Sequence, residues 1–379
     1  MSSQFEHLKN WLLNSGLCVF QKNDPQYGGV HSFYDIKEQK FGFLYPEITG
    51  YYISTMRFLY SDEKKEQYLE HAKASADWLI KIYKKYGTIV QGISSEPSQQ
   101  NYAYSFDISI CAKGLLDYYM MSNDELYLSH AKEILEPVIG GALEQDGTIL
   151  PFRNLDSEKF QQSYDVWYRQ KGCLHIKNAM TFCQLYKILN EKIFLEYAEK
   201  ICNVFSIYQN NDGSFLMHEN QKTINLHTMC YALEGLLFSF SVNKNENYLK
   251  SCIAAVNWCK EKLQDDGSIE LWFNSKHRSK ASYPTAQLLR IVLLLDKLGQ
   301  NRQYEDLAKK LYDHLLSYQI SNPHLEQNGA LLEENYRTIL GWKMRQKLNS
   351  WGSMFALQAL YWYDNFDRIS FDKQIELLF

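Results

Sequence analysis

The sequence has no long apolar run and no excess of positive charge. None of its 379 residues lies in a stretch long and apolar enough to cross a bilayer, so no membrane span is expected. The formal net charge is −4, and Lys and Arg form no block, which argues against nucleic acid as a partner. Met1–His7 lack the basic and then apolar order of a signal peptide. These absences together predict a cytoplasmic protein.

Closely spaced cysteine pairs are also absent. The eight cysteines form no Cys-x-x-Cys motif, and many fall in predicted helices, where a reduced cysteine behaves as a small apolar residue. A disulfide framework is therefore not expected. Cys173, His175, His227 and Cys230 could meet across two helices, but their spacing matches no compact zinc signature. We predict neither a metal nor another cofactor, with zinc on this set as the weaker alternative.

Apolar and aromatic side chains are abundant, and one stretch shows how they are used. Hydrophobic residues make up 45% of the chain, which is enough for a large core. An amphipathic helix near Phe194–Ala198 is followed by the turn Gln209–Phe215 and by a second helix over Leu226–Phe240. This second helix is apolar on nearly every side, which is typical of a helix surrounded by protein. The stretch therefore predicts an outer helix followed by an inner one.

The same unit recurs along the chain. In five outer helices an aromatic residue stands four positions before a small residue, and a glycine turn follows each of these helices. The five signatures are Tyr68–Ala72, Tyr127–Ala131, Phe194–Ala198, Tyr248–Cys252 and Tyr304–Ala308, and the turns contain Gly87, Gly147, Gly213, Gly267 and Gly329. Asp-Gly and Asn-Gly suit such turns because both residues tolerate positive φ.

Six apolar helices follow the polar loops that come after the turns. They begin near Glu47, Asp107, His175, His227, Thr285 and Ser350. Only five outer helices lie between them, so we expect the N-terminal helix, Gln4–Leu17, to pack beside the last inner helix, Trp351–Tyr363, as the sixth. An open stack of hairpins would need polar end caps, which the apolar last helix does not provide. The pattern predicts one all-α domain over residues 1–379, a closed (α/α)6 toroid of six inner and six outer helices.

This repeat pattern resembles the α/α toroids. That group includes six-hairpin glycosidases, several polysaccharide lyases and sugar epimerases, and the terpenoid cyclases with the protein prenyltransferases. The resemblance covers the whole chain but rests on the helix and turn pattern, without a family-specific catalytic motif. One fold hosts many chemistries, so the resemblance implies a fold and leaves the function to the site residues.

The long loops all lead to the N-termini of inner helices, which predicts a single mouth where six helix starts converge. Glu47 and Asp107 stand at two consecutive starts. They are candidates for the acid and base, or acid and nucleophile, of glycosidic bond cleavage. The competing interpretation is structural, because carboxylates in a first helical turn also stabilise the helix dipole.

His175 and His227 open the next two inner helices and are candidates for proton transfer near neutral pH. A buried, hydrogen-bonded structural histidine is the competing interpretation. Aromatic and polar side chains at the same helix starts and loops are candidates for binding a saccharide, by stacking and by hydrogen bonding or ion pairing. These predicted binding residues are Tyr45, Tyr104, Arg153, Trp167, Asn178, Trp272, Arg278, Tyr283, Asn349 and Trp351.

Two motifs of isoprenoid enzymes are missing. Tyr283–Gln287 resembles the region where squalene-type cyclases carry an aspartate acid, but has no aspartate, and no Asp-Asp-x-x-Asp motif occurs. Isoprenoid cyclisation is therefore disfavoured. The residues favour a carbohydrate-active enzyme, a glycoside hydrolase acting on an oligosaccharide or glycan intermediate. A uronate lyase or sugar epimerase with a His or Tyr base is one alternative, and a non-catalytic glycan- or partner-binding toroid in polysaccharide assembly is another.

Overall fold

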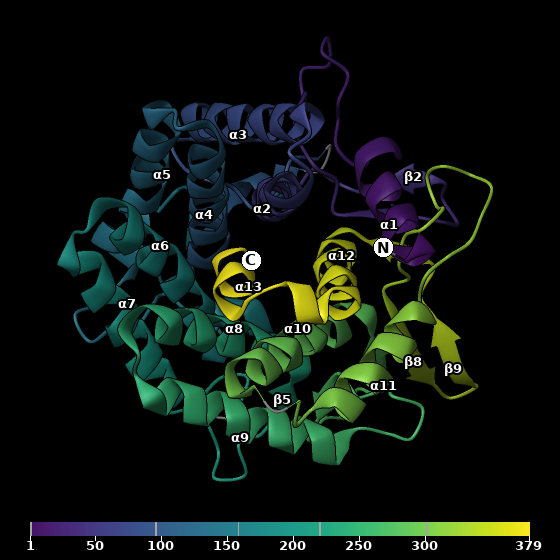
Figure 1. The fold of residues 1–379 in the computed structure, drawn as a ribbon. Helices are drawn as coiled ribbons and strands as arrows, with labels where there is room; N and C mark the ends of the chain where they lie inside the picture. Colours follow the sequence, from purple (N-terminus) through teal and green to yellow (C-terminus); the bar gives the residue numbers. More distant parts are fainter. Residues whose placement is uncertain (1, 95–96, 158, 220, 301) are drawn as a thin grey trace.

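The fold was analysed in a computed structural model that describes residues 2–94, 97–157, 159–219, 221–300 and 302–379. It is all-α in class, with a few short strands (Figure 1). The inner helices are α2 (Pro46–Glu63), α4 (Ser105–Ser122), α6 (Ala179–Leu189), α8 (Leu226–Asn243), α10 (Ser282–Gly299) and α12 (Ser350–Asp364). The outer helices are α1 (Ser3–Asn14), α3 (Glu66–Tyr86), α5 (Glu125–Pro137), α7 (Lys192–Ser206), α9 (Glu246–Lys262) and α11 (Glu305–Leu316).

Inner helices are buried along most of their length and pack with little space between backbones. A Cβ atom added to Gly50 of α2 would lie 2.8 Å from the Ile110 carbonyl oxygen of α4. One added to Gly114 of α4 would lie 2.8 Å from the Gly50 carbonyl oxygen. Glycine at both positions lets α2 and α4 approach closely. This close packing fixes the relative positions of the N-termini of the two helices.

Four of the five predicted glycine turns, those of Gly147, Gly213, Gly267 and Gly329, pack against the next outer helix around the ring. Gly213 has a φ of +93°, and a Cβ atom there would lie 2.4 Å from the Ala254 carbonyl oxygen of α9. Gly329 has a φ of +90°, and a Cβ atom there would lie 2.3 Å from the His7 carbonyl oxygen of α1. The last turn of the chain therefore rests on the first helix, as the middle turns rest on the outer helices that follow them.

The N-terminal helix packs against the last inner helix, as predicted, and α12 in turn packs against α2. Trp11 of α1 donates a hydrogen bond from Nε1 to the Glu326 carbonyl oxygen at 2.8 Å. The boundary differs from the prediction, because α1 ends at Asn14. Gly16 adopts a φ of +91° just beyond that end, and the chain turns away there before it reaches Leu17.

Short strands stand immediately before several inner helices and hold the loops together. Strand β3 (Tyr102–Tyr104) pairs with β4 (Phe152–Asn154), and β5 (Ile224–Asn225) pairs with β6 (Trp272–Phe273). A three-stranded sheet contains β7 (Ser279–Ala281), β8 (Glu334–Thr338) and β9 (Gly341–Met344). Another contains β1 (Phe33–Asp35), β2 (Lys40–Phe41) and β10 (Lys347–Asn349). These pairings link neighbouring loops where they enter the inner helices.

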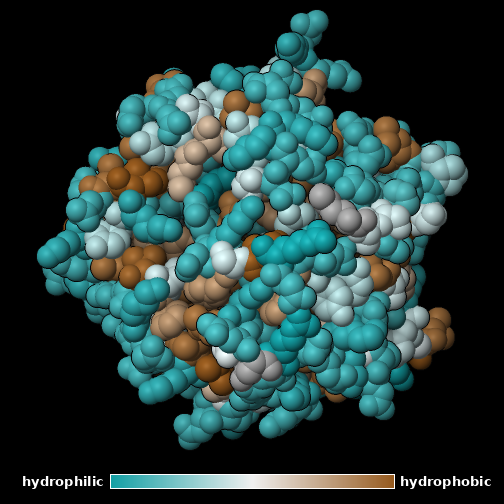
Figure 2. All heavy atoms as spheres, viewed as in Figure 1, coloured by the Kyte–Doolittle hydropathy of each residue, from teal (hydrophilic) through white to brown (hydrophobic). Residues whose placement is uncertain are grey.

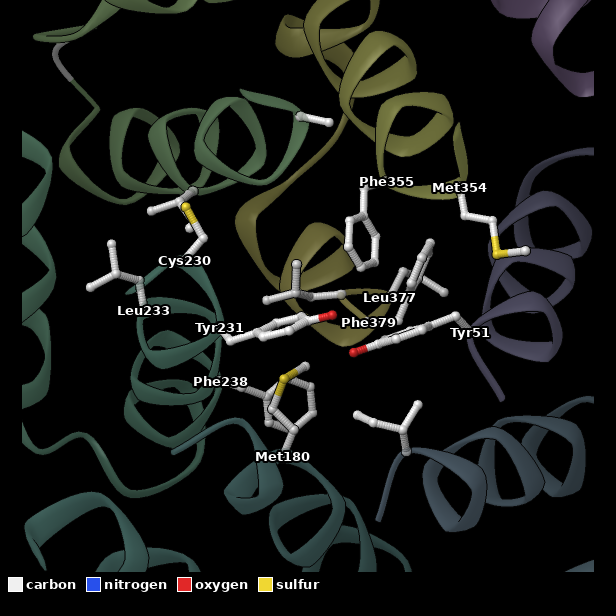
Figure 3. Packing of buried hydrophobic residues seen from close by; sticks show 14 of the residues in the cluster. Tyr51, Met180, Cys230, Tyr231, Leu233, Phe238, Met354, Phe355, Leu377 and Phe379 are labelled. Atoms are coloured by element: carbon white, nitrogen blue, oxygen red, sulfur yellow. The ribbon is translucent and has the colours of Figure 1, made fainter. Parts of the chain in front are cut away.

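A short C-terminal helix, α13 (Phe371–Glu376), lies inside the ring of helices (Figure 1). Phe379 is fully buried, and its ring centroid lies 6.3 Å from that of Tyr51 and 6.0 Å from that of Phe355. Figure 3 shows these rings together in the central core, with the hydroxyls of Tyr51 and Tyr231 directed toward each other. The centre of the molecule is therefore packed with side chains below the mouth.

The outer surface is mainly polar. On the face in Figure 2, hydrophilic residues predominate and apolar residues form small separate patches. Among the described residues, no helix has the length and apolar character needed to cross a membrane.

Candidate active site

A pocket of about 270 Å³ opens where the inner helices begin. Nine of the fourteen predicted site residues line it: Tyr45, Glu47, Tyr104, Asp107, Trp167, His175, His227, Tyr283 and Trp351. The other lining residues are Ile48, Gln91, Phe106, Pro151, Tyr168, Leu174 and Tyr231. The convergence of the helix starts thus brings residues that are far apart in the sequence, between Tyr45 and Trp351, to one cavity.

Two carboxyl groups enter this pocket from neighbouring helices. Glu47 and Asp107 lie in the first turns of α2 and α4, whose close packing places these turns side by side. Only 7% of Glu47 and 4% of Asp107 are exposed, so both carboxyls are largely removed from bulk water. Asp107 Oδ2 has no hydrogen-bond partner among the described residues. A buried acceptor without a partner is costly unless a proton or a ligand satisfies it.

Burial raises the pKa of Glu47 to about 7, while the Tyr45 hydroxyl and the positive charge of Lys177 oppose the rise. Burial also raises the pKa of Asp107 well above its ordinary value, and the nearby charge of Glu47 raises it further. Two interacting carboxyls release their protons in steps that belong to the pair. At neutral pH the pair therefore retains a proton, so one of the two carboxyls is available as an acid.

His227 is held in one tautomer by α10. Its Nδ1 lies 2.5 Å from Gln287 Oε1, and an amide oxygen only accepts, so Nδ1 carries the proton and Nε2 has a free lone pair. Burial lowers the pKa of His227 to about 3. The imidazole packs against Tyr231 and Tyr283, with ring centroids 4.2 Å and 4.7 Å away. His227 is therefore neutral at physiological pH.

His175 is more deeply buried than His227 and is 1% exposed. Burial lowers its pKa to about 4, so it is also neutral at pH 7. Its Nε2 lies 3.4 Å from the Gln170 carbonyl oxygen, and its Nδ1 lies 3.4 Å from Asn178 Nδ2. These long contacts hold the ring at the pocket wall.

Aromatic side chains form the walls of the pocket. Tyr104 and Tyr168 contact each other edge to face at 5.6 Å, and Trp167 contacts Tyr168 at 5.5 Å. Tyr283 and Trp351 lie 5.9 Å apart on another part of the wall. Rings with polar tips in a partly wet cavity suit a ligand that has both apolar faces and hydroxyl groups.

Five predicted binding residues do not line this pocket. Asn178 lies behind His175 and is fully buried. Asn349 caps α12, because its Oδ1 accepts a hydrogen bond from the Gly352 N–H at 2.7 Å. Arg153 extends over the Phe160 ring, 5.4 Å from its centroid. Trp272 and Arg278 line a second hollow beside the pocket.

A charged cluster that the sequence pattern does not predict lies below the pocket. Lys177 donates to Glu234 Oε2 at 2.5 Å, Gln287 donates to the same oxygen at 3.2 Å, and Arg290 pairs with the other oxygen. The Lys177 ammonium lies 4.6 Å from the centroid of the Tyr231 ring, which lines the pocket. Charged residues within otherwise apolar predicted helices could have indicated this cluster, because such charges are seldom buried without partners.

The alternative of a zinc site has no geometric support. Among the described residues, no group of three or more His, Cys, Asp and Glu side chains is arranged to hold a metal ion. Burial raises the pKa of Cys173 to about 12 and that of Cys230 well above its ordinary value. In the metal-free protein both thiols are therefore protonated.

Sequence comparison gives no match to a known protein family model and none to a curated protein. Structure comparison does give matches. Cellobiose 2-epimerase from Bacillus thermoamylovorans is 12% identical, with 97% of this chain and 100% of that chain covered and a TM-score of 0.77. A D-mannose isomerase is 12% identical, with coverages of 95% and 97% and a TM-score of 0.74. The unsaturated glucuronyl hydrolase of Bacillus sp. GL1 is 11% identical, with coverages of 95% and 97% and a TM-score of 0.71.

The chain has the fold of these enzymes. All three are α/α-toroid enzymes that act on sugars, and the match extends over nearly the whole of each chain. Identities near 12% show a shared fold without showing a shared reaction.

Proposed function

We propose that this chain is a carbohydrate-active enzyme that acts on an oligosaccharide or a glycan intermediate. We further propose that it forms one domain, a closed (α/α)6 toroid in which α1 and α12 complete the ring. The structural neighbours support a saccharide ligand, since they include sugar epimerases, an isomerase and a glucuronyl hydrolase. The aromatic walls and polar floor of the pocket fit the same ligand class.

We propose glycoside hydrolysis as the reaction. The observation that carries it is the pair of buried, interacting carboxyls in one aromatic pocket. The protonated member donates its proton to the glycosidic oxygen as the bond to the anomeric carbon breaks. The ionised member either activates water or attacks the anomeric carbon. An acid with a pKa near 7 is well suited to this role at neutral pH, because it is substantially protonated and still transfers its proton readily.

Epimerisation or uronate elimination is the second candidate, and the geometry of His227 favours it. Its unprotonated Nε2 is available to remove a carbon-bound proton, and the rings of Tyr231 and Tyr283 pack beside it. A pKa of about 3 makes this imidazole a weak base, however, which favours the carboxyl pair as the proton-transfer group.

The test is turnover of a glycan panel by the purified protein and by three variants, Asp107→Asn, His227→Gln and the control Asp296→Asn. Asp107→Asn removes a proton carrier while preserving shape, so we expect turnover to fall by on the order of 10² to 10⁴ with folding intact. The matched control is Asp296→Asn, which changes another buried carboxyl with a raised pKa, near the far end of α10. Full activity of Asp107→Asn together with loss in His227→Gln would transfer the proposal to epimerisation or elimination. Sugar binding without turnover of any glycan would favour a binding protein.

A further inference from the structure

A second hollow of about 490 Å³ adjoins the pocket. It shares Trp167, His227 and Tyr283 with the pocket, so the two cavities lie side by side at this wall. Its other side is formed by the segment that contains β6 and β7 and by the hairpin of β8 and β9. The hollow is thus the space next to the pocket that a longer ligand would reach beyond Trp167 and Tyr283.

The charge of the hollow is opposite to that of the whole chain. Four cationic side chains line it, and Glu334 is the only carboxylate among its lining residues within the described part of the chain. The four cations, here called the basic groove, are Lys276, Arg278, Arg337 and Arg345. The complete chain has a net charge of −4, so this concentration of positive charge is local.

Two of the arginines are held in position by carboxylates. Arg278 pairs with Glu270 at 2.6 Å, and Arg345 pairs with Glu334 at 2.5 Å. Within the described residues, Lys276 and Arg337 form no ion pair with a carboxylate. The basic groove therefore retains positive charge after its internal pairs are counted.

Pairing between β7 and β8 brings two of these cations close together. The Arg337 N–H donates to the Arg278 carbonyl oxygen at 2.8 Å, which places the two residues on adjacent chain segments. Like charges on adjacent segments repel each other unless an anion lies between or above them. Trp272, on the same wall, offers a ring face on which a sugar can stack.

We propose that the basic groove binds an anionic group of the saccharide whose reacting bond lies in the pocket. This inference rests on the proposed function and specifies the substrate class as an acidic glycan. Guanidinium groups match the planar oxygen pairs of carboxylates and phosphates, so an anion can be bound through two parallel hydrogen bonds. The anion is either a uronate carboxylate or a phosphate ester, and both have the same recognition chemistry.

Binding of three probes by isothermal titration calorimetry tests the proposal and separates the two sources. The probes are cellobiose, a disaccharide of glucuronate and glucose, and glucose 1-phosphate. We expect one anionic probe to bind at least tenfold more tightly than cellobiose in 50 mM NaCl. This preference should decrease in 500 mM NaCl, because salt screens exposed charges. The anion that binds more tightly identifies carboxylate or phosphate as the group recognised.

Variants assign the preference to the basic groove. Lys276→Gln with Arg337→Gln should abolish the anion preference and leave the affinity for cellobiose unchanged. Lys343→Gln is the matched control, since Lys343 is an exposed cation on the same hairpin that does not line the hollow. Equal affinities for the three probes, no binding of any probe, or an anion preference that survives the double substitution would each overturn the proposal.

These outcomes are separable from failure of the proposed function. If anion binding depends on Arg337 but the protein turns over no glycan, the proposed anion site is supported and the proposed hydrolase activity is contradicted. If the protein turns over neutral glycans and shows no anion preference, the hydrolase activity is supported and the proposed anion site is contradicted.

Discussion

At the scale of single residues, Glu47 couples the stability of the protein to pH. Its pKa is about 7 in the folded protein, against an ordinary value of 4.5, because burial disfavours the charged form. The folded state therefore holds this proton more tightly than the unfolded chain. The resulting stabilisation is fully present below about pH 4.5 and is lost as the pH rises through 7.

Glu47→Gln should therefore stabilise the protein at neutral and alkaline pH. We expect no difference from the unmodified protein at pH 4 and a gain of about 3 kcal/mol at pH 8, which corresponds to a melting temperature about 4 °C higher for a chain of this length. Differential scanning calorimetry over this pH range measures the effect.

Asp117→Asn provides a control of opposite sign. Asp117 is buried, but Lys113 and Arg57 lower its pKa below the ordinary value, so its charge stabilises the folded state above the unfolded pKa. This variant should lose stability at neutral pH. A Glu47→Gln effect that does not change with pH would contradict the raised pKa of Glu47 and favour a purely structural carboxylate.

The sequence predicts which residues reach the pocket through their position on a helix, but not those that reach it through contacts between helices. Glu47 and Asp107 were predictable because first-turn carboxylates at consecutive inner helices must point to one end of the ring. Lys177 lies in the 3-10 helix Cys173–Asn178, which leads into α6, and Tyr231 lies in α8; their contact depends on how these two segments pack. Asn349 has the residue type of a binding group but serves as a helix cap.

At the scale of elements, the glycine turns are where the repeats are joined. Gly213 requires positive φ and leaves no room for a side chain against α9, whereas Gly87 has a φ of +68° and no atom within 4 Å of an added Cβ. Both substitutions by alanine incur the cost of left-handed backbone, roughly 1 kcal/mol. Only Gly213→Ala adds a clash with the Ala254 carbonyl group.

We therefore expect Gly213→Ala to lower the free energy of unfolding by about 3 kcal/mol or more, and Gly87→Ala by about 1 kcal/mol. Urea denaturation followed by tryptophan fluorescence measures both. Equal losses in the two variants would show that backbone conformation alone, and not contact with the next outer helix, makes glycine necessary at position 213.

Helices and turns were predictable because each has a local signal, whereas the small sheets were not. Inner-helix starts follow from apolar runs after polar loops, and the observed starts of α2, α4, α8 and α12 lie within a few residues of the predicted ones. Strand pairs such as β3 with β4 join loops about 50 residues apart and are only three residues long. Strands this short have no periodicity that a sequence can display.

At the scale of the whole molecule, the ring needs a filled centre below the pocket. The chain supplies it with α13 and the residues after it, where Leu378 and Phe379 are fully buried. Arg290 of α10 donates from Nη1 to the Phe379 carbonyl oxygen at 3.1 Å, and Arg57 of α2 binds both the carbonyl and the carboxylate of Glu376. Separate inner helices are thus tied to one central segment.

Phe379→Ala tests whether this central segment stabilises the whole ring. The side chain packs among Tyr51, Phe355 and Arg290, so its removal leaves a cavity shared by three inner helices. We expect the free energy of unfolding to fall by about 3–5 kcal/mol, the usual cost of truncating a buried phenylalanine. Phe371→Ala, at the half-buried start of α13, should cost only about 1 kcal/mol because less apolar surface is lost there. Calorimetric unfolding should remain a single transition in both variants if the helices unfold as one cooperative unit. A small loss for Phe379→Ala, or a separate early transition, would show that the C-terminal segment is an appendage on a ring that is stable without it.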